Sequence, residues 1–260
     1  MSTENNMIRR GFLAQAIGGF GLLTLGGCSK IAARAWGHRI LHSVEGLTRR
    51  AQRQFLSPGA LAPEYAESDM SPVFKANGTQ SPDDANFQAL AANNFADYRL
   101  EIDGLVERPA QLSLPELRAL PAREQITRHD CVEGWSCIGK WKGVKLGELL
   151  DSAGLKPKAK YVVFHCFDTL EKTLDGSGIY YESIDLGDAF HPQTILAYEM
   201  NGVTLPLAHG APLRLRLERQ LGYKMAKYIR RIEVVENFAG FGRGNGGFWE
   251  DRGYEWYAGI

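Results

Sequence analysis

The sequence predicts an α+β domain with mixed β-sheets and short helices over residues 85–260. Three observations favour this class. Strand-like segments dominate this part of the chain, short helical segments lie between them, and strands and helices do not alternate regularly. A doubly wound parallel sheet requires such alternation, so that fold is not expected.

The first elements of the domain follow from alternation and capping. In YRLEIDGLV, residues 98–106, apolar and charged side chains alternate, which indicates a half-buried strand. Ser113 and Glu116 have the spacing of a capping box, so a short helix should begin there. A second helix is expected over residues 146–153, because Gly154 suits a helix C-terminus.

The later strands follow from apolar runs and one turn. KYVVFHCFD, residues 160–168, is typical of a buried strand. Asn201 and Gly202 favour a tight hairpin turn between the strands ILAYEM and VTLPL. PLRLRLE, residues 212–218, alternates again, and YIRRIEVVE, residues 228–236, supplies the last strand.

Residues 1–27 are interpreted as an export signal. Arg9 and Arg10 precede a nearly uncharged run that ends in small residues, and RRGFL resembles the twin-arginine signal of proteins exported in folded form. A general secretory signal is the alternative. The sequence Leu-Gly-Gly before Cys28 resembles a lipobox, which predicts a periplasmic protein lipid-anchored to a membrane; an uncleaved tether or release are the alternatives. Residues 28–84 are expected to be a linker or N-terminal extension.

The overall charge excludes one class of partner. Thirty basic residues balance thirty acidic ones, so the protein has no net positive charge that would attract nucleic acid. After Cys28, three cysteines remain, namely Cys131, Cys137 and Cys166. Because three is odd, at least one thiol must lack an intramolecular partner.

Two of these cysteines lie in RHDCVEGWSC, residues 128–137. Cys131 and Cys137 fit a disulfide, a metal site or a nucleophile. His129 and Cys131 lie too close along one strand to favour a zinc site, and no local motif supports a thiol hydrolase. The sequence has no Cys-x-x-Cys-His for covalent haem and no glycine-rich nucleotide loop. The interpretation that remains is a cysteine thiolate that binds a soft transition metal.

A basic segment extends from Arg214 to Arg231. It contains seven basic residues and one acid, Glu218; the basic residues are Arg214, Arg216, Arg219, Lys224, Lys227, Arg230 and Arg231. Arginine side chains beside glycine turns suit a phosphate or diphosphate. The alternative is a solvated strand face.

Three segments carry a resemblance to a known family. CVEGWS at residues 131–136, NGVTLPLAHGAPLRLRL at 201–217 and GYKMAKYIRRIEV at 222–234 resemble the sulfite oxidase-type molybdenum oxidoreductases. The similarity is greatest to the bacterial branch that contains the catalytic subunit of periplasmic methionine sulfoxide reductase. It implies a sulfite oxidase-like molybdopterin-binding fold and one molybdenum atom bound by a single molybdopterin and one cysteine. Cys131 stands at that position, as metal ligand and catalytic residue.

The resemblance also implies contacts with the cofactor. Asn93 and the backbone at Ala96 and Asp97 are expected to lie against the pterin. Cys166 stands where relatives often carry Thr, and Arg214 is expected to bind the phosphate. The full set of implied cofactor contacts is Asn93, Ala96, Asp97, Cys131, Cys166, His209, Arg214, Met225, Ala226 and Lys227.

The expected activity is oxygen-atom transfer by a periplasmic molybdenum oxidoreductase. Reduction of sulfoxides, such as methionine sulfoxide in proteins, is favoured, with electrons from a separate carrier such as a membrane cytochrome b. The alternatives are a sulfite dehydrogenase that passes electrons to a cytochrome and a non-catalytic lipid-anchored binding protein. A monomer is expected. The aromatic tail after Phe238 either covers the active site, forms a partner surface or packs on the domain.

Overall fold

The structure, a computed structural model, describes residues 44, 46–51, 53–54, 59–174 and 178–260. The expected export signal and Cys28 lie outside these residues. The chain divides into two compact units, residues 1–55 and 56–260. Within the described residues, no helix is long and apolar enough to cross a membrane. All features below belong to the second unit.

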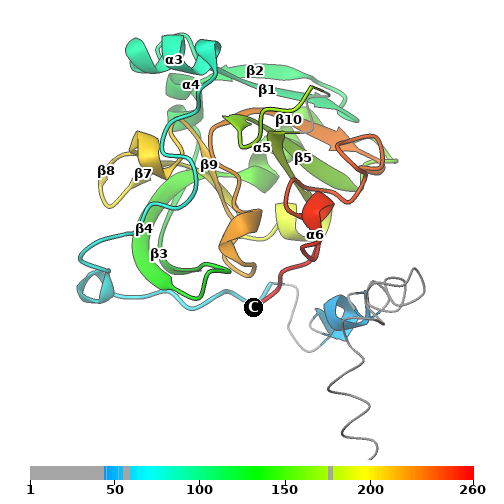
Figure 1. The fold of residues 1–260 in the computed structure, drawn as a ribbon, viewed down its shortest axis with the longest axis horizontal. Helices are drawn as coiled ribbons and strands as arrows, with labels where there is room; N and C mark the ends of the chain where they lie inside the picture. The colour runs from blue at the N-terminus through cyan, green and yellow to red at the C-terminus, as the bar shows by residue number, and fades with distance from the viewer. Residues whose placement is uncertain (1–43, 45, 52, 55–58, 175–177) are drawn as a thin grey trace, which may run out of the picture. The chain divides into compact units, whose positions relative to one another are not determined.

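The first of two five-stranded sheets is mixed. Its strands, in spatial order, are β2 (Ala110–Ser113), β1 (Arg99–Gly104), β10 (Ile229–Val235), β5 (Tyr161–Thr169) and β6 (Ile179–Asp185). Strands β1 and β10 are parallel, whereas the other neighbours are antiparallel (Figure 1). The predicted α+β class with mixed sheets is therefore confirmed.

The second sheet is antiparallel and carries the long hairpin drawn in green in Figure 1. It contains β3 (Ala122–Asp130), β4 (Ser136–Lys145), β7 (Ile195–Met200), β8 (Val203–Thr204) and β9 (Arg214–Arg216). Strand β9 pairs with β7, not with its predecessor β8. The predicted hairpin turn joins β7 to β8, and both of its residues have positive φ, 51° at Asn201 and 79° at Gly202.

Short helices connect the strands. The α-helices are α3 (Ala85–Ala92), α4 (Leu114–Ala119), α5 (Leu146–Ala153) and α6 (Leu186–Ala189), and the 3-10 helices are η1 (Glu67–Asp69), η2 (Leu207–His209), η3 (Gly222–Lys224) and η4 (Glu250–Arg252). The capping box is confirmed, because the Ser113 N–H donates to Glu116 Oε2 at 2.8 Å. The end of α5 at Gly154, whose φ is 71°, is confirmed as well.

Residues 59–84, which composition assigns to a linker or N-terminal extension, pack on β3 and β4 within the second unit. Figure 1 draws this segment in cyan beside β3 and β4. The Tyr65 N–H donates to Ile126 O at 2.9 Å, and the Ser71 N–H donates to Ile138 O at 3.0 Å. Their polar, glycine- and proline-rich composition reflects an irregular backbone and not detachment from the domain.

Candidate active site

One cavity of about 340 Å³ brings together segments that are far apart in the sequence. The segment 74–79, the end of β3, the end of β5, strand β9, residues 222–227 and the C-terminal tail all contribute to its wall. Its lining residues are Phe74, Lys75, Asn77, Gly78, Thr79, His129, Cys131, Val132, Glu133, Asp168, Leu170, Tyr180, Arg214, Gly222, Tyr223, Met225, Lys227, Trp249 and Tyr254.

Cys131 occupies the turn between β3 and β4. Its N–H donates to Trp135 O at 2.9 Å, and Gly134, with φ of 83°, donates to Cys131 O at 3.0 Å. The turn thereby holds the thiol at the cavity. Burial raises the pKa of this thiol, whereas the backbone N–H of Glu133 and the side-chain amide of Asn77 favour the thiolate. Asn77 Nδ2 lies 3.1 Å from Cys131 Sγ.

The other two described cysteines have different surroundings. Cys137 is buried on β4, opposite His129 on β3, and its thiol faces Val73 O at 3.8 Å. Cys131, Cys137 and Cys166 are all free thiols, so no disulfide joins these three. Cys131 is therefore available as a ligand.

Arg214 is a buried cation at the cavity. Its Nη1 donates to His209 O at 3.1 Å, and its guanidinium lies 5.2 Å from the Trp141 ring. Its Nε has no hydrogen-bond partner in the described part of the chain. Burial, and then the charge of Arg216, lowers the pKa of Arg214 to about 9. An anion beside such a buried charge would stabilise it.

Lys227 lies at the same cavity and connects two loops. Its Nζ donates to Asn77 O at 2.7 Å, to Thr79 O at 2.5 Å and to Ala208 O at 3.4 Å. Burial, and then the charge of Arg214, lowers the pKa of Lys227 to about 7. Lys227 therefore adds charge to the cavity while its N–H groups hold residues 77–79 in place.

Asp168, at the end of β5, offers a hydrogen-bond acceptor. Its Oδ1 is buried at the cavity without a hydrogen-bond partner among the described residues, and burial raises the pKa of its carboxyl group. Cys166, two residues earlier, is 0% exposed within the hydrophobic core and does not line the cavity. The geometry thus presents Asp168, and not Cys166, to a ligand there.

The structure brings some of the expected cofactor contacts to the cavity. Cys131, Arg214, Met225 and Lys227 line it. His209 lies behind this wall: its carbonyl accepts from Arg214, and its ring packs at 5.7 Å from that of Phe74. Ala226 is fully buried.

Asn93, Ala96 and Asp97 do not line the cavity. Asn93 is the C-cap residue of α3, and its side chain donates to Asp97 Oδ2 at 2.6 Å on the surface. The asparagine beside the thiol is Asn77, which lies before α3. The dipeptide Asn77-Gly78 is a turn signal that could have drawn attention to this segment.

The basic segment does not act as one cluster. Of its seven basic residues, only Arg214 and Lys227 line the cavity. Four others pair with carboxylates: Arg216 with Glu218, Arg219 with Asp188, Lys224 with Glu182 and Glu250, and Arg231 with Asp103. The alternative of a solvated strand face is wrong for β9, because all three of its residues are buried.

The C-terminal tail forms one side of the cavity. Trp249 and Tyr254 line it, and their rings lie 5.3 Å apart. Lys224 Nζ donates to Glu250 Oε1 at 2.6 Å, and Tyr223 OH donates to Glu255 O at 2.6 Å. These bonds anchor the tail on both sides of its aromatic residues, as expected for a segment that covers the site.

A family model described as the oxidoreductase molybdopterin binding domain matches residues 88–240. The chain belongs to this family. The protein is accordingly a molybdopterin-dependent oxidoreductase of the sulfite oxidase type, and its cofactor is molybdenum–molybdopterin.

Three curated relatives of this molybdopterin oxidoreductase are informative. A protein of Azospira oryzae named "Putative protein-methionine-sulfoxide reductase subunit YedZ1" is 38% identical over 96% of this chain and 87% of its own length. The protein-methionine-sulfoxide reductase catalytic subunits MsrP of Xanthomonas campestris and Gluconobacter oxydans are 37% and 38% identical, over 61% and 54% of this chain. The matches span about half of the length of these two MsrP subunits.

Among solved structures, the sulfane dehydrogenase SoxCD of Paracoccus pantotrophus aligns with a TM-score of 0.47 and 24% identity. The alignment covers 55% of this chain and 39% of that chain.

The cavity of this molybdopterin oxidoreductase fits its cofactor. The unpartnered Nε of Arg214 and the charge of Lys227 suit a phosphate, and the unpartnered oxygen of Asp168 suits the N–H groups of a pterin ring. Within the described residues, no three His, Cys, Asp or Glu side chains converge to hold a metal. A metal bound at Cys131 would take further ligands from the organic part of the cofactor.

Proposed function

We propose that this protein is an exported, periplasmic molybdenum oxidoreductase that reduces sulfoxides, including methionine sulfoxide in proteins. The observation that carries the proposal is the position of Cys131 in a cavity bordered by exposed apolar and aromatic side chains. The names of the relatives support the substrate class, because all three contain methionine sulfoxide reductase.

The residues around Cys131 prepare its sulfur to bind a metal. Burial raises the pKa of Cys131, and hydrogen bonds from the backbone N–H of Glu133 and the amide of Asn77 to the sulfur offset part of this effect. Residues 77–79 are in turn held by Lys227. When bound, the molybdenum centre supplies two-electron chemistry with transfer of an oxygen atom.

The two ends of the cofactor would be held by different kinds of side chain. Arg214 and Lys227 would bind the phosphate, since Arg214 is a buried cation, Lys227 is a partly buried one, and neither forms an ion pair with a carboxylate among the described residues. Asp168 would accept hydrogen bonds from the pterin ring. These contacts orient the cofactor relative to Cys131 and exclude water from its buried side.

The outer edge of the cavity suits a thioether side chain. Val132 is 46% exposed and Tyr254 is 37% exposed, and both line the cavity together with Trp249. Aromatic rings make favourable contacts with sulfur and with the methyl group of methionine. An exposed edge also admits a methionine sulfoxide that belongs to a protein surface.

The net reaction converts a sulfoxide, two electrons and two protons into a sulfide and water. The electrons would come from a separate carrier, for which a membrane cytochrome b is our proposal. The Arg9-Arg10 pair and the lipobox-like sequence before Cys28 support export and a position next to the membrane. We propose that the protein works as a monomer with this carrier.

The first experiment measures molybdenum, pterin and turnover on the same purified protein. We expect about one molybdenum per chain and oxidation of reduced viologen dye by methionine sulfoxide. Cys131→Ser should abolish turnover, whereas Cys137→Ser, the matched control at a buried thiol outside the cavity, should retain it. A molybdenum-loaded protein that oxidises sulfite and does not reduce methionine sulfoxide would overturn the proposal.

A further inference from the structure

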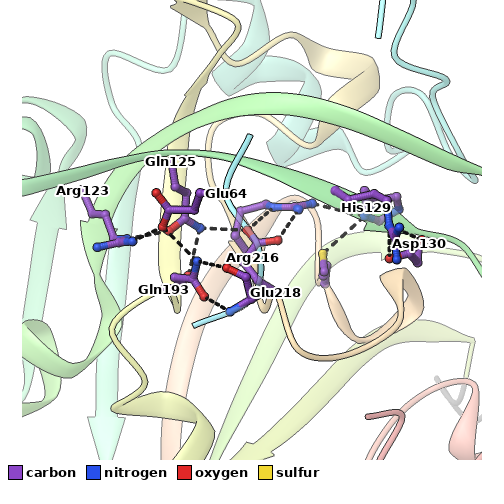
Figure 2. Close-up of polar contacts among 11 residues, drawn as sticks. Glu64, Arg123, Gln125, His129, Asp130, Gln193, Arg216 and Glu218 are labelled. Carbon is purple, nitrogen blue, oxygen red and sulfur yellow. Dashed lines mark hydrogen bonds and ion pairs between the residues drawn. The ribbon is translucent and has the colours of Figure 1, made fainter. Parts of the chain in front are cut away.

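Figure 2 shows a polar network that runs from His129 through Arg216 and Glu218 to Glu64. His129 lines the cavity at one end, and Glu64 lies at the other. Between them lie Arg216, Glu218 and two glutamines, all buried. Of these side chains only His129 lines the cavity.

Arg216 is fully buried and its charge is balanced locally. Its Nε donates to Glu218 Oε1 at 3.0 Å and its Nη2 donates to Glu218 Oε2 at 2.6 Å. The guanidinium lies 4.3 Å from the Trp141 ring, which limits its rotation. Its remaining bond goes from Nη1 to His129 Nδ1, at 3.1 Å.

The rest of the network fixes Glu218. Gln125 Nε2 donates to Glu218 Oε1 at 2.8 Å and to Gln193 O at 3.0 Å. Gln193 Nε2 donates to Glu64 Oε1 at 2.9 Å. Because each guanidinium nitrogen of Arg216 has a partner, its side chain is held in one orientation that presents Nη1 to the imidazole of His129.

This contact decides which nitrogen of His129 carries the proton. Arginine has only donors, so His129 Nδ1 must accept and cannot bear hydrogen. Met225 Sδ lies 3.4 Å from the same nitrogen, but a thioether sulfur is a weak acceptor and competes poorly with a charged donor. The proton of the neutral imidazole therefore resides on Nε2.

The Nε2 edge of His129 lies against a glycine, whose lack of a side chain makes room for the ring. Gly222 packs beside it, and a Cβ atom there would lie 2.3 Å from His129 Cε1 and 2.4 Å from Nε2. Gly222 also lines the cavity, and Nε2 has no hydrogen-bond partner among the described residues. Cys131 follows two residues after His129 and lines the same cavity.

We propose that His129 donates a hydrogen bond from Nε2 to the oxygen of the sulfoxide substrate, and that Arg216 is the positioning residue that keeps the proton on this nitrogen. This inference rests on the proposed function. It assigns the buried network a role in recognition of an oxygen acceptor next to the metal ligand Cys131.

Two substitutions separate donation to the substrate from satisfaction of Arg216. In His129→Asn, the amide oxygen can replace Nδ1 as the acceptor for Arg216, but nothing replaces Nε2. In His129→Gln, the amide nitrogen reaches the position of Nε2 and restores a donor. If His129 only satisfied Arg216, His129→Asn would bind the sulfoxide at least as well as His129→Gln.

The first test is binding of methionine sulfoxide to the oxidised, molybdenum-loaded enzyme, which cannot reduce it, by isothermal titration calorimetry. We expect His129→Asn to weaken binding about 10- to 100-fold and His129→Gln to weaken it less than about 3-fold, at equal molybdenum content. Unchanged binding in His129→Asn, or equal losses in both variants, overturns the inference alone. Wild-type enzyme that does not bind the sulfoxide overturns the proposed function as well.

The second test reads the tautomer directly by ¹⁵N–¹H NMR of the imidazole. We expect the proton of His129 on Nε2 in the wild-type enzyme. The double variant Arg216→Met with Glu218→Met removes the buried pair together, so that neither charge is left alone, and should populate both tautomers. A proton on Nδ1 in the wild-type enzyme, or an unchanged tautomer in the double variant, overturns the role of Arg216.

Discussion

Substitution of Arg214 by methionine should have opposite effects on the cofactor-free and the cofactor-loaded protein. Burial lowers the pKa of Arg214 from its ordinary, strongly basic value to about 9. At about 1.36 kcal/mol for each pKa unit, the charge costs the folded cofactor-free protein about 5 kcal/mol. This cost is fully present below about pH 9 and is lost as the pH rises from there towards the ordinary pKa of arginine.

Two contacts of Arg214 offset part of this cost. The hydrogen bond to His209 O contributes about 1 kcal/mol, and the contact with the Trp141 ring contributes about 1–2 kcal/mol. Arg214→Met should therefore stabilise the cofactor-free protein at pH 7 by about 2 kcal/mol, or about 4–8 °C in Tm. In the loaded protein, loss of a charged bond to phosphate should weaken cofactor binding about 100-fold.

The assay uses protein from a host that cannot make molybdopterin, alongside protein from a competent host. Urea unfolding at pH 7 gives the stability of the first, and molybdenum and pterin content describe the second. Arg230→Met is the matched control, because this arginine is exposed and lies outside the cavity; it should change stability by less than about 0.5 kcal/mol. A destabilised cofactor-free Arg214→Met protein that retains full pterin content would refute the reasoning.

Three further predictions follow from other buried groups. Burial lowers the pKa of Lys227 to about 7, so binding of pyrophosphate to the cofactor-free protein should take up protons at pH 8 and weaken as the pH rises from 7 to 9. Calorimetry in two buffers with different ionisation enthalpies measures the proton uptake. Lys227→Arg should abolish the proton uptake. Burial raises the pKa of Glu182, so the folded protein binds more protons than the unfolded chain from about pH 4.5 upwards and loses stability as the pH rises. Glu182→Gln should therefore gain stability over wild type more at pH 8 than at pH 5 in urea titrations; an equal difference at both would contradict this. Gly222→Ala should lower the free energy of unfolding by about 1–3 kcal/mol and displace His129, because a Cβ atom there would overlap the ring. Gly240→Ala, where a Cβ atom meets open space, should leave stability unchanged. Thermal unfolding measures the stability of both variants, and sulfoxide binding reports the displacement of His129.

The local elements were predictable because their causes lie within a few residues. The capping box of Ser113 and Glu116 and the turn at Asn201-Gly202 depend on backbone conformation and on neighbours in the sequence. The parallel pairing of β1 with β10 was not predictable in this way, since it joins segments more than a hundred residues apart and reflects packing of the whole domain.

The candidate site was predictable only in part. The resemblance directed attention to Cys131, Arg214 and Lys227, which the fold brings to one cavity. It also directed attention to Asn93, which does not line this cavity, while the chain positions Asn77 against the thiol. Composition had assigned the region of Asn77 to a linker, since turn-forming residues are common both in linkers and in loops that form active sites.

By itself the sequence determined the fold class, the short capped helices, the odd number of thiols beyond Cys28 and the local excess of basic residues. Only the tertiary structure decided what each basic residue does. Arg214 and Arg216 are both buried on β9, yet Arg214 faces the cavity without a carboxylate partner in the described part of the chain, while Arg216 pairs with Glu218 and contacts His129. The reason is physical: the energy of a buried charge depends on the groups around it, and those groups come from strands and loops far away in the sequence.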